Sequence, residues 1–80
     1  MNVFYSKSSL KYLSKLEKDI RTNIITAIDK LPKEGDVNKM RGQTIDGIFR
    51  LRVGKFRVLF HWKAATIKIL DIDTRGDIYK

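Results

Sequence analysis

The alternation of apolar and polar residues is clearest in the stretch IFRLRVGKFRVLFHWK, residues 48–63. A period of two is typical of β-strands, and Gly54-Lys55 interrupts it where two strands would turn back on each other. Glycine in the first central position suits a type II′ hairpin turn. A two-residue loop also fixes the register, so we expect six cross-strand pairs. They are Val53–Phe56, Arg52–Arg57, Leu51–Val58, Arg50–Leu59, Phe49–Phe60 and Ile48–His61.

This register gives the hairpin two different faces, because opposed residues point to the same side. The predicted core face carries Phe49, Leu51, Val53, Phe56, Val58 and Phe60. The other face carries Arg50, Arg52 and Arg57 near the turn, and Ile48, Leu59 and His61 toward the far end. Opposed like charges repel, so Arg52 and Arg57 either have salt-bridge partners elsewhere or bind an anion. We favour the anion, because the arginine fork grips phosphate oxygens in pairs.

Two helices are predicted before the hairpin, after a short strand at residues 2–5, NVFY. Ser6 is a candidate N-cap for the first helix. Its apolar stripe comprises Leu10, Leu13 and either Tyr12 or Leu16. The second stripe comprises Ile20, Ile24, Ala27, Ile28 and Leu31. We place a break near residues 16–18, with one continuous helix as the alternative.

The segments that flank the hairpin are less regular. Pro32 ends the second helix, and residues 33–46 form a polar connection that Met40 is expected to anchor in the core. Residues 66–72 form the third strand of a meander, although Ile69, Leu70 and Ile72 blur its alternation.

These elements predict an α+β fold in a single domain, residues 1–80, with the order strand, helix, helix and three antiparallel strands. The helical hairpin packs on the core face and leaves the arginine face uncovered. Because the last strand runs antiparallel to its neighbour, it returns toward the Gly54 turn. Arg75 and Tyr79 follow it and can join Arg52 and Arg57; Tyr79 can alternatively cover the sheet edge.

Composition narrows the possible chemistry. The net charge of +8, with 17 Lys and Arg against 9 Asp and Glu, favours an acidic partner such as nucleic acid. The chain has no cysteine and one histidine, so we expect no disulfide, metal or cofactor. No apolar run reaches the ~20 residues of a membrane span, and residues 1–10 do not resemble a signal peptide. We therefore expect a cytoplasmic protein.

Cations and phenols are the groups available for catalysis, and such a set can cleave RNA without metal. The 2′-hydroxyl of RNA is a built-in nucleophile, and arginines placed in advance can stabilise the charge that develops on the phosphate. DNA lacks this hydroxyl, so such a site would act on RNA alone.

Five stretches together resemble the RelE toxins of bacterial toxin–antitoxin modules, within the RelE/ParE superfamily. They are FYSKSSLKYLSKL, IRTNIITAIDKL, KMRGQTIDG, FRLRVGKFRVLF and DIDTRGDIY. The resemblance implies a β-α-α-β-β-β fold of the microbial-RNase type and a cognate antitoxin that wraps the toxin. It also implies metal-free endonuclease cleavage of mRNA in the ribosomal A site, which leaves a 2′,3′-cyclic phosphate and inhibits translation.

The resemblance also assigns roles to individual residues. The catalytic residues would be Arg52, Arg57, Arg75 and Tyr79, and Arg50 matches a basic residue of the first hairpin strand. We expect Arg50, Arg41 and Lys55 to bind RNA. Known members have lysines where Arg50 and Arg52 stand, and arginine stays protonated, so the proton acceptor would be Tyr79 or a neighbouring base. Two alternatives remain: a ParE-like inhibitor of DNA gyrase, and a non-catalytic member that binds nucleic acid.

Overall fold

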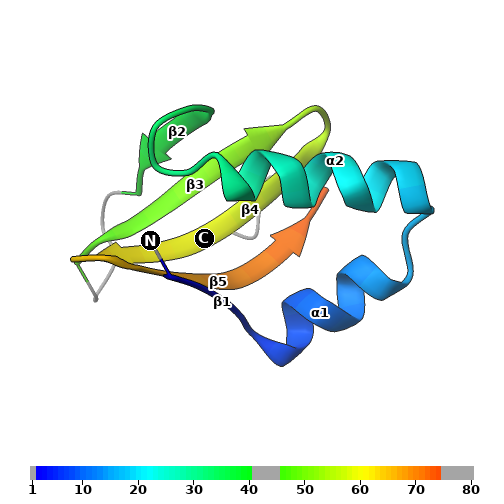
Figure 1. Ribbon diagram of the computed structural model, residues 1–80, viewed down its shortest axis with the longest axis horizontal. Helices are drawn as coiled ribbons and strands as arrows, with labels where there is room; N and C mark the ends of the chain where they lie inside the picture. Colours follow the sequence, from blue (N-terminus) through cyan, green and yellow to red (C-terminus); the bar gives the residue numbers. More distant parts are fainter. Residues whose placement is uncertain (1, 41–45, 75–80) are drawn as a thin grey trace.

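The computed structural model describes residues 2–40 and 46–74, which form two helices and a five-stranded sheet (Figure 1). The elements are β1 (Asn2–Tyr5), α1 (Lys7–Ser14), α2 (Lys18–Asp29), β2 (Asp36–Lys39), β3 (Ile48–Val53), β4 (Phe56–Lys63) and β5 (Thr66–Asp73). The strand order is β1-β5-β4-β3-β2. The α+β class is confirmed, and the sheet is mixed because β1 pairs in parallel with β5 while the other pairs are antiparallel.

The predicted hairpin register is confirmed at all six positions. Arg52 lies opposite Arg57 and Phe49 lies opposite Phe60, with the other four pairs as expected. Gly54 has a positive φ of 58°, which is the backbone conformation that the first central residue of a type II′ turn requires. The turn therefore determines which side chains meet across β3 and β4.

Strand β2 was not predicted, because its sequence DVNK reads as part of a polar connection. It pairs antiparallel with β3, placing Val37 beside Leu51. As an edge strand it is exposed except at Val37, which packs against the core. An edge strand of this kind lacks the apolar alternation by which a strand is recognised.

The helices are separate, as predicted, with the break between Ser14 and Lys18. The Ser6 hydroxyl caps α1 by accepting a hydrogen bond from the Ser9 amide. The expected stripe on α1 is wrong at Leu10, which is 54% exposed, whereas Ser9 is fully buried. The second helix ends at Asp29, before Pro32.

Serine rather than leucine faces the sheet on α1 because β1 leaves the sheet at this point. The Ser6 amide donates to the Ile69 carbonyl at 2.9 Å, and the Ser6 hydroxyl donates to the Leu70 carbonyl at 2.9 Å. The Ser9 hydroxyl donates to the Ile69 carbonyl at 3.5 Å. These bonds satisfy β5 carbonyls that β1 no longer reaches, and they tie the start of α1 to β5.

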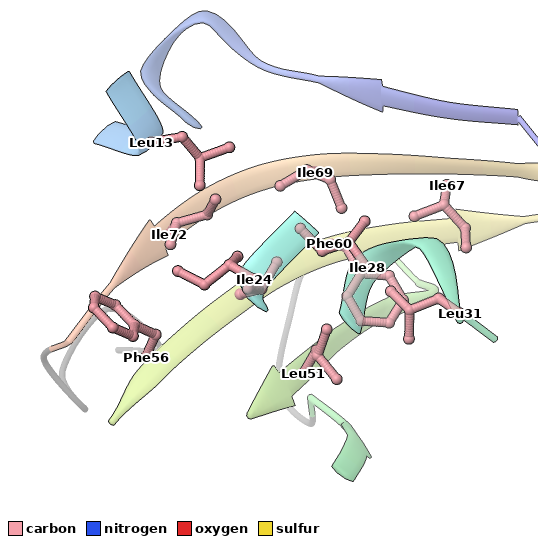
Figure 2. Close-up of a cluster of buried hydrophobic side chains, with 11 residues drawn as sticks. Leu13, Ile24, Ile28, Leu31, Leu51, Phe56, Phe60, Ile67, Ile69 and Ile72 are labelled. Atoms are coloured by element: carbon pink, nitrogen blue, oxygen red, sulfur yellow. The ribbon is translucent and has the colours of Figure 1, made fainter. Parts of the chain in front are cut away.

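The core lies between the two helices and one face of the sheet (Figure 2). Phe60 and Val58 are fully buried there against Ile24 and Ile28 of α2, as predicted. Phe49 is half-buried and stacks on Phe60 with ring centroids 5.7 Å apart. Leu13 of α1, Leu31 after α2, and Leu51, Phe56, Ile67, Ile69 and Ile72 of the sheet complete the cluster. Both helices therefore pack on the predicted core face.

Met40 does not anchor the core as expected. It is half-buried and lies outside the core cluster. Its amide instead donates to the Ile48 carbonyl at 2.9 Å, which continues the pairing beyond the end of β2.

A register shift in β5 explains its blurred alternation. Phe60 pairs with Ile69, but Leu59 pairs with Asp71, so one extra residue is inserted. Ile69 and Ile72 both point to the core as a result, while Leu70 lies on the other face. This is the effect expected of a β-bulge.

Neither helix of the described residues is long and apolar enough to cross a membrane.

Candidate anion-binding site on the open face of the sheet

The arginines of β3 and β4 lie on the face of the sheet turned away from the helices, which we call the open face. They alternate along their strands with buried Leu51, Phe56 and Val58, so their side chains point away from the core. Arg52 is exposed, whereas Arg57 is half-buried. Their Cα atoms are direct cross-strand partners, as predicted. Two guanidinium groups are therefore presented side by side at the turn end of the hairpin.

Carboxylates flank this arginine pair on both sides. Asp36 of β2 lies opposite Arg52, and Asp73 of β5 lies opposite Arg57. Four neighbouring strands thus carry Asp36, Arg52, Arg57 and Asp73 in one line, which we call the charged row. Opposite charges on neighbouring strands attract, so the carboxylates offset part of the repulsion between the arginines. The register thus places one carboxylate beside each arginine, and the anion site stays a prediction.

These carboxylates were missed in the sequence. Asp36 lies on the unpredicted strand β2, and the bulge in β5 prevented any assignment of a register to Asp73. The alternating pattern of β4 together with an antiparallel return does place the end of β5 next to Arg57. Pairing the last residues of β5 with the first residues of β4 is the signal that could have placed Asp73 beside Arg57.

The two aspartates of β5 have defined local contacts. Asp73 is half-buried as a residue, and its Oδ1 accepts an exposed hydrogen bond from the Thr74 amide at 2.6 Å. The Oδ1 of Asp71 accepts from the Ile72 amide at 2.9 Å. Asp71 lies opposite Leu59, so it stands one row further from the arginine pair.

The next row along the open face contains Arg50. Its Cα partners are Asn38 on β2 and Leu59 on β4. Arg50 is half-buried and its Nε is shielded from solvent. It stands two residues from Arg52 on the same face.

His61 lies away from the arginines, as predicted. It is half-buried opposite Ile48, four residues from Arg57 along β4, or about 13 Å at the usual rise of a strand. With Ile48, Lys68 and Leu70 it lines a shallow pocket at the far end of the open face. Ile48 is buried although it lies on this face. The far end of the open face therefore combines apolar Ile48 and Leu70 with the cation Lys68.

Lys55 lies at the turn beside the charged row. It is exposed, and its Nζ is 5.6 Å from the centroid of the Phe56 ring. Arg41, Arg75 and Tyr79 lie outside the described residues, so their contribution to the site stays a prediction. The direction of β5 agrees with that prediction, since the strand ends at Asp73 beside Arg57.

Tyr5, a tyrosine with a raised pKa, lies away from the arginine pair. Burial raises the pKa of Tyr5 above its usual range, and the negative charge of Asp29 raises it further. Tyr5 packs against the core cluster, on the helix side of the sheet. Among residues 2–40 and 46–74, no three His, Cys, Asp or Glu side chains come together as they would around a metal ion. Tyr5 is therefore not part of the open face.

Comparison with solved structures identifies the fold. The chain matches RelE in the RelE–RelB complex of Pyrococcus horikoshii with 28% identity and a TM-score of 0.74, over 95% of this chain and 96% of that one. It matches the toxin–antitoxin complex RelBE2 of Mycobacterium tuberculosis with 26% identity and a TM-score of 0.74, over 95% and 92%. It matches the RelB–RelE complex of Methanococcus jannaschii with 24% identity and a TM-score of 0.75, over 95% and 94%.

No protein-family model matches the chain, and no curated protein matches it either. The structural matches span nearly the whole of both chains, and they support the family that the sequence resembles, the RelE toxins.

Proposed function

We propose that this chain is a RelE-type toxin of a toxin–antitoxin module that cleaves mRNA on the ribosome without a metal ion. As proposed, it acts as a single domain in the cytoplasm and stops translation. The observation that supports the enzyme most directly is the arginine pair: Arg52 and Arg57 lie side by side on a face that the helices leave open. Such a pair can bind a phosphodiester through several charge-assisted hydrogen bonds.

The roles follow from the chemistry of RNA cleavage. Arg52 and Arg57, joined by Arg75, bind the scissile phosphate and stabilise the charge that develops on it. Arg50 holds a flanking phosphate, and Lys55 and Arg41 contact the RNA backbone. Tyr79 orients or deprotonates the 2′-hydroxyl, or stacks on a base. The products are a 2′,3′-cyclic phosphate and a 5′-hydroxyl.

The proposed partner is an antitoxin, because the matched structures are RelE toxins in complex with RelB antitoxins. A chain with a net charge of +8 would be held by an acidic segment laid over the open face or along a sheet edge. We expect the affinity of the purified pair to fall as salt rises from about 50 to 500 mM, since salt screens such contacts. An affinity that does not change with salt would rule out electrostatic capture.

Induction of the chain in growing cells separates the proposed function from gyrase inhibition. We expect protein synthesis to stop within minutes, with new mRNA ends inside codons and no change in DNA supercoiling. Gyrase-dependent DNA breaks without mRNA cleavage would instead establish the ParE-like function. Neither effect, from a folded chain, would identify a non-catalytic binding protein.

A modified substrate tests the nucleophile directly. An mRNA with a 2′-deoxy or 2′-O-methyl group at the cleaved nucleotide should resist cutting, because the attacking hydroxyl is absent or blocked. The control is the unmodified mRNA, assayed with and without EDTA, which removes metal ions. Polyamines, which EDTA does not bind, keep the ribosomes intact in both assays. Normal cutting of the modified mRNA would exclude the proposed mechanism.

A further inference from the structure

The proposed reaction requires a group that removes the proton of the 2′-hydroxyl. Arg50, Arg52 and Arg57 cannot do so, because guanidinium groups stay protonated in proteins. A general base has to lie within hydrogen-bond reach of that proton, next to the groups that hold the phosphate. The charged row offers carboxylates in this position.

The geometry points to Asp73 as the proton acceptor of the proposed ribonuclease, an inference that rests on the function proposed above. Asp73 is the direct cross-strand partner of Arg57. Cβ atoms of opposed residues are usually about 4.5–5.5 Å apart, which is close enough for a phosphate on Arg57 to bring its neighbouring 2′-hydroxyl to the carboxylate. The Thr74 amide, 2.6 Å from Oδ1, holds the carboxylate at the end of β5.

The other two aspartates of the open face fit this role less well. Asp36 is exposed on the edge strand β2, beside the exposed Arg52, so water competes for its carboxylate. Asp71 lies beside Leu59 rather than beside an arginine. Of the three, Asp73 is the direct cross-strand partner of the half-buried Arg57.

Charged groups of the sheet lie around Asp73 on the open face. Arg57 of β4 is its neighbour, Arg52 of β3 lies one strand further, and Asp71 lies on the same strand. The helix α1 packs on the other face of β5, and its exposed Lys7 and Lys11 do not share the face of the carboxylate. By register, the cation next to Asp73 is therefore Arg57.

In the proposed step, the Asp73 carboxylate takes the proton of the 2′-hydroxyl while the 2′-oxygen forms a bond to phosphorus. The bond between phosphorus and the 5′-oxygen breaks, and that oxygen takes a proton from water. The carboxylic acid then returns its proton to the hydroxide left behind, so that neither the enzyme nor the total proton count changes.

The test compares Asp73→Asn with Asp71→Asn, its matched control on the same strand, in single-turnover cleavage of mRNA on programmed ribosomes. Both changes remove one negative charge from the open face, but we expect only Asp73→Asn to remove the proton acceptor. The asparagine keeps an oxygen to accept the Thr74 amide, so the end of β5 keeps its hydrogen bond. We expect Asp73→Asn to lose about 10²–10⁴-fold in rate, Asp71→Asn to stay near the wild-type rate, and Asp73→Glu to recover part of the loss.

The dependence of rate on pH separates a proton acceptor from a residue that only positions Arg57. A carboxylate is already ionised at about pH 6.5–8.5, so the wild-type rate should be flat there. In Asp73→Asn hydroxide must remove the proton, and the rate should rise about tenfold per pH unit. A wild-type rate that itself rises tenfold per unit would overturn the inference without any variant.

Two further results would also overturn it: an Asp73→Asn rate equal to that of Asp71→Asn, or a lower Asp73→Asn rate that does not change with pH. A wild-type chain that cuts no mRNA would reject the proposed function itself. Cleavage by the wild type that Asp73→Asn leaves unchanged rejects the role of Asp73 alone.

Discussion

Replacement of Arg57 by alanine should leave the fold nearly unchanged while removing most of the activity. Arg57 is one strand from Arg52 and one from Asp73, and two strands from Asp36. At a strand spacing of about 4.8 Å, two unit charges in water interact by about 0.9 kcal/mol. The repulsion from Arg52 and the attraction to Asp73 therefore cancel.

What remains is the attraction between Arg57 and Asp36 at about twice that spacing, which amounts to about 0.4 kcal/mol before screening by salt. We accordingly expect Arg57→Ala to change the free energy of unfolding by less than about 0.5 kcal/mol from charge effects. Loss of a preorganised charge stabiliser typically costs about 10²–10³-fold in rate, or about 2.7–4 kcal/mol of activation free energy. The effect on catalysis should therefore exceed the effect on folding several times over.

Lys63→Ala is the matched control. Lys63 is exposed on the same strand and the same face, and its replacement removes the same charge. It is six residues from Arg57, about 20 Å along the strand, which is beyond the Debye length of about 8 Å at physiological salt. We expect its cleavage rate to stay within about threefold of the wild type.

The measurements are single-turnover cleavage of mRNA on ribosomes and urea unfolding of each variant. A folded Arg57→Ala protein that cleaves as fast as Lys63→Ala would refute the assignment of the arginine pair as the phosphate site. Unfolding of Arg57→Ala at low urea would refute the charge balance worked out for the row.

Three further predictions concern other parts of the chain. Phe60→Ala should destabilise the protein by about 3–5 kcal/mol, because Phe60 is fully buried; urea unfolding followed by Trp62 fluorescence measures this loss. The control is Phe4→Ala, at a residue that is 57% exposed, and it should cost less than about 1 kcal/mol. Equal losses in the two variants would contradict the core assignment. His61→Ala should remain toxic on induction, and loss of cleavage with the fold preserved would make His61 a catalytic candidate. The pKa of Tyr5 is raised in the folded protein, so its contribution to stability is complete below the unfolded pKa of about 10 and is lost as the pH rises through the folded pKa. Tyr5→Phe should therefore remove this alkaline loss of stability. An unfolding profile at alkaline pH that is the same in Tyr5→Phe and the wild type would contradict the prediction.

The hairpin could be predicted residue by residue because its signals are local. Alternation shows which residues share a face, and the loop at Gly54 sets which residues oppose each other. The helix break near Leu16 was also visible, since the apolar stripe changes phase there. Each of these signals lies within about ten residues of the feature that it predicts.

The features that were missed depend on contacts between distant segments. Strand β2 forms because β3 offers an unpaired edge to DVNK, which has little strand character of its own. Ser9 is buried because its hydroxyl reaches the Ile69 carbonyl sixty residues away, and no helical periodicity shows this. The extra residue in β5 similarly depends on pairing with β4.

The candidate site shows the same contrast between features set by local sequence and features set by contacts of distant segments. The opposition of Arg52 and Arg57 was predicted because both lie in one hairpin. Their flanking carboxylates, Asp36 and Asp73, come from strands whose register could not be assigned from the sequence. Local pattern therefore identified the positive half of the charged row, and only the assembled sheet shows the negative half.

The arginine pair is maintained by the same register that buries the core. A slip of one residue would turn every side chain of a strand to the opposite face, moving Arg57 toward the helices and Phe60 toward water. Burial of one such aromatic side chain contributes about 1.5–3 kcal/mol, and several apolar residues of β3 and β4 are buried together. The repulsion between two arginines on adjacent strands, about 0.9 kcal/mol in water, is too small to shift that register. The core thus holds the two guanidinium groups together against their repulsion, and a bound phosphate would remove the strain that the core imposes.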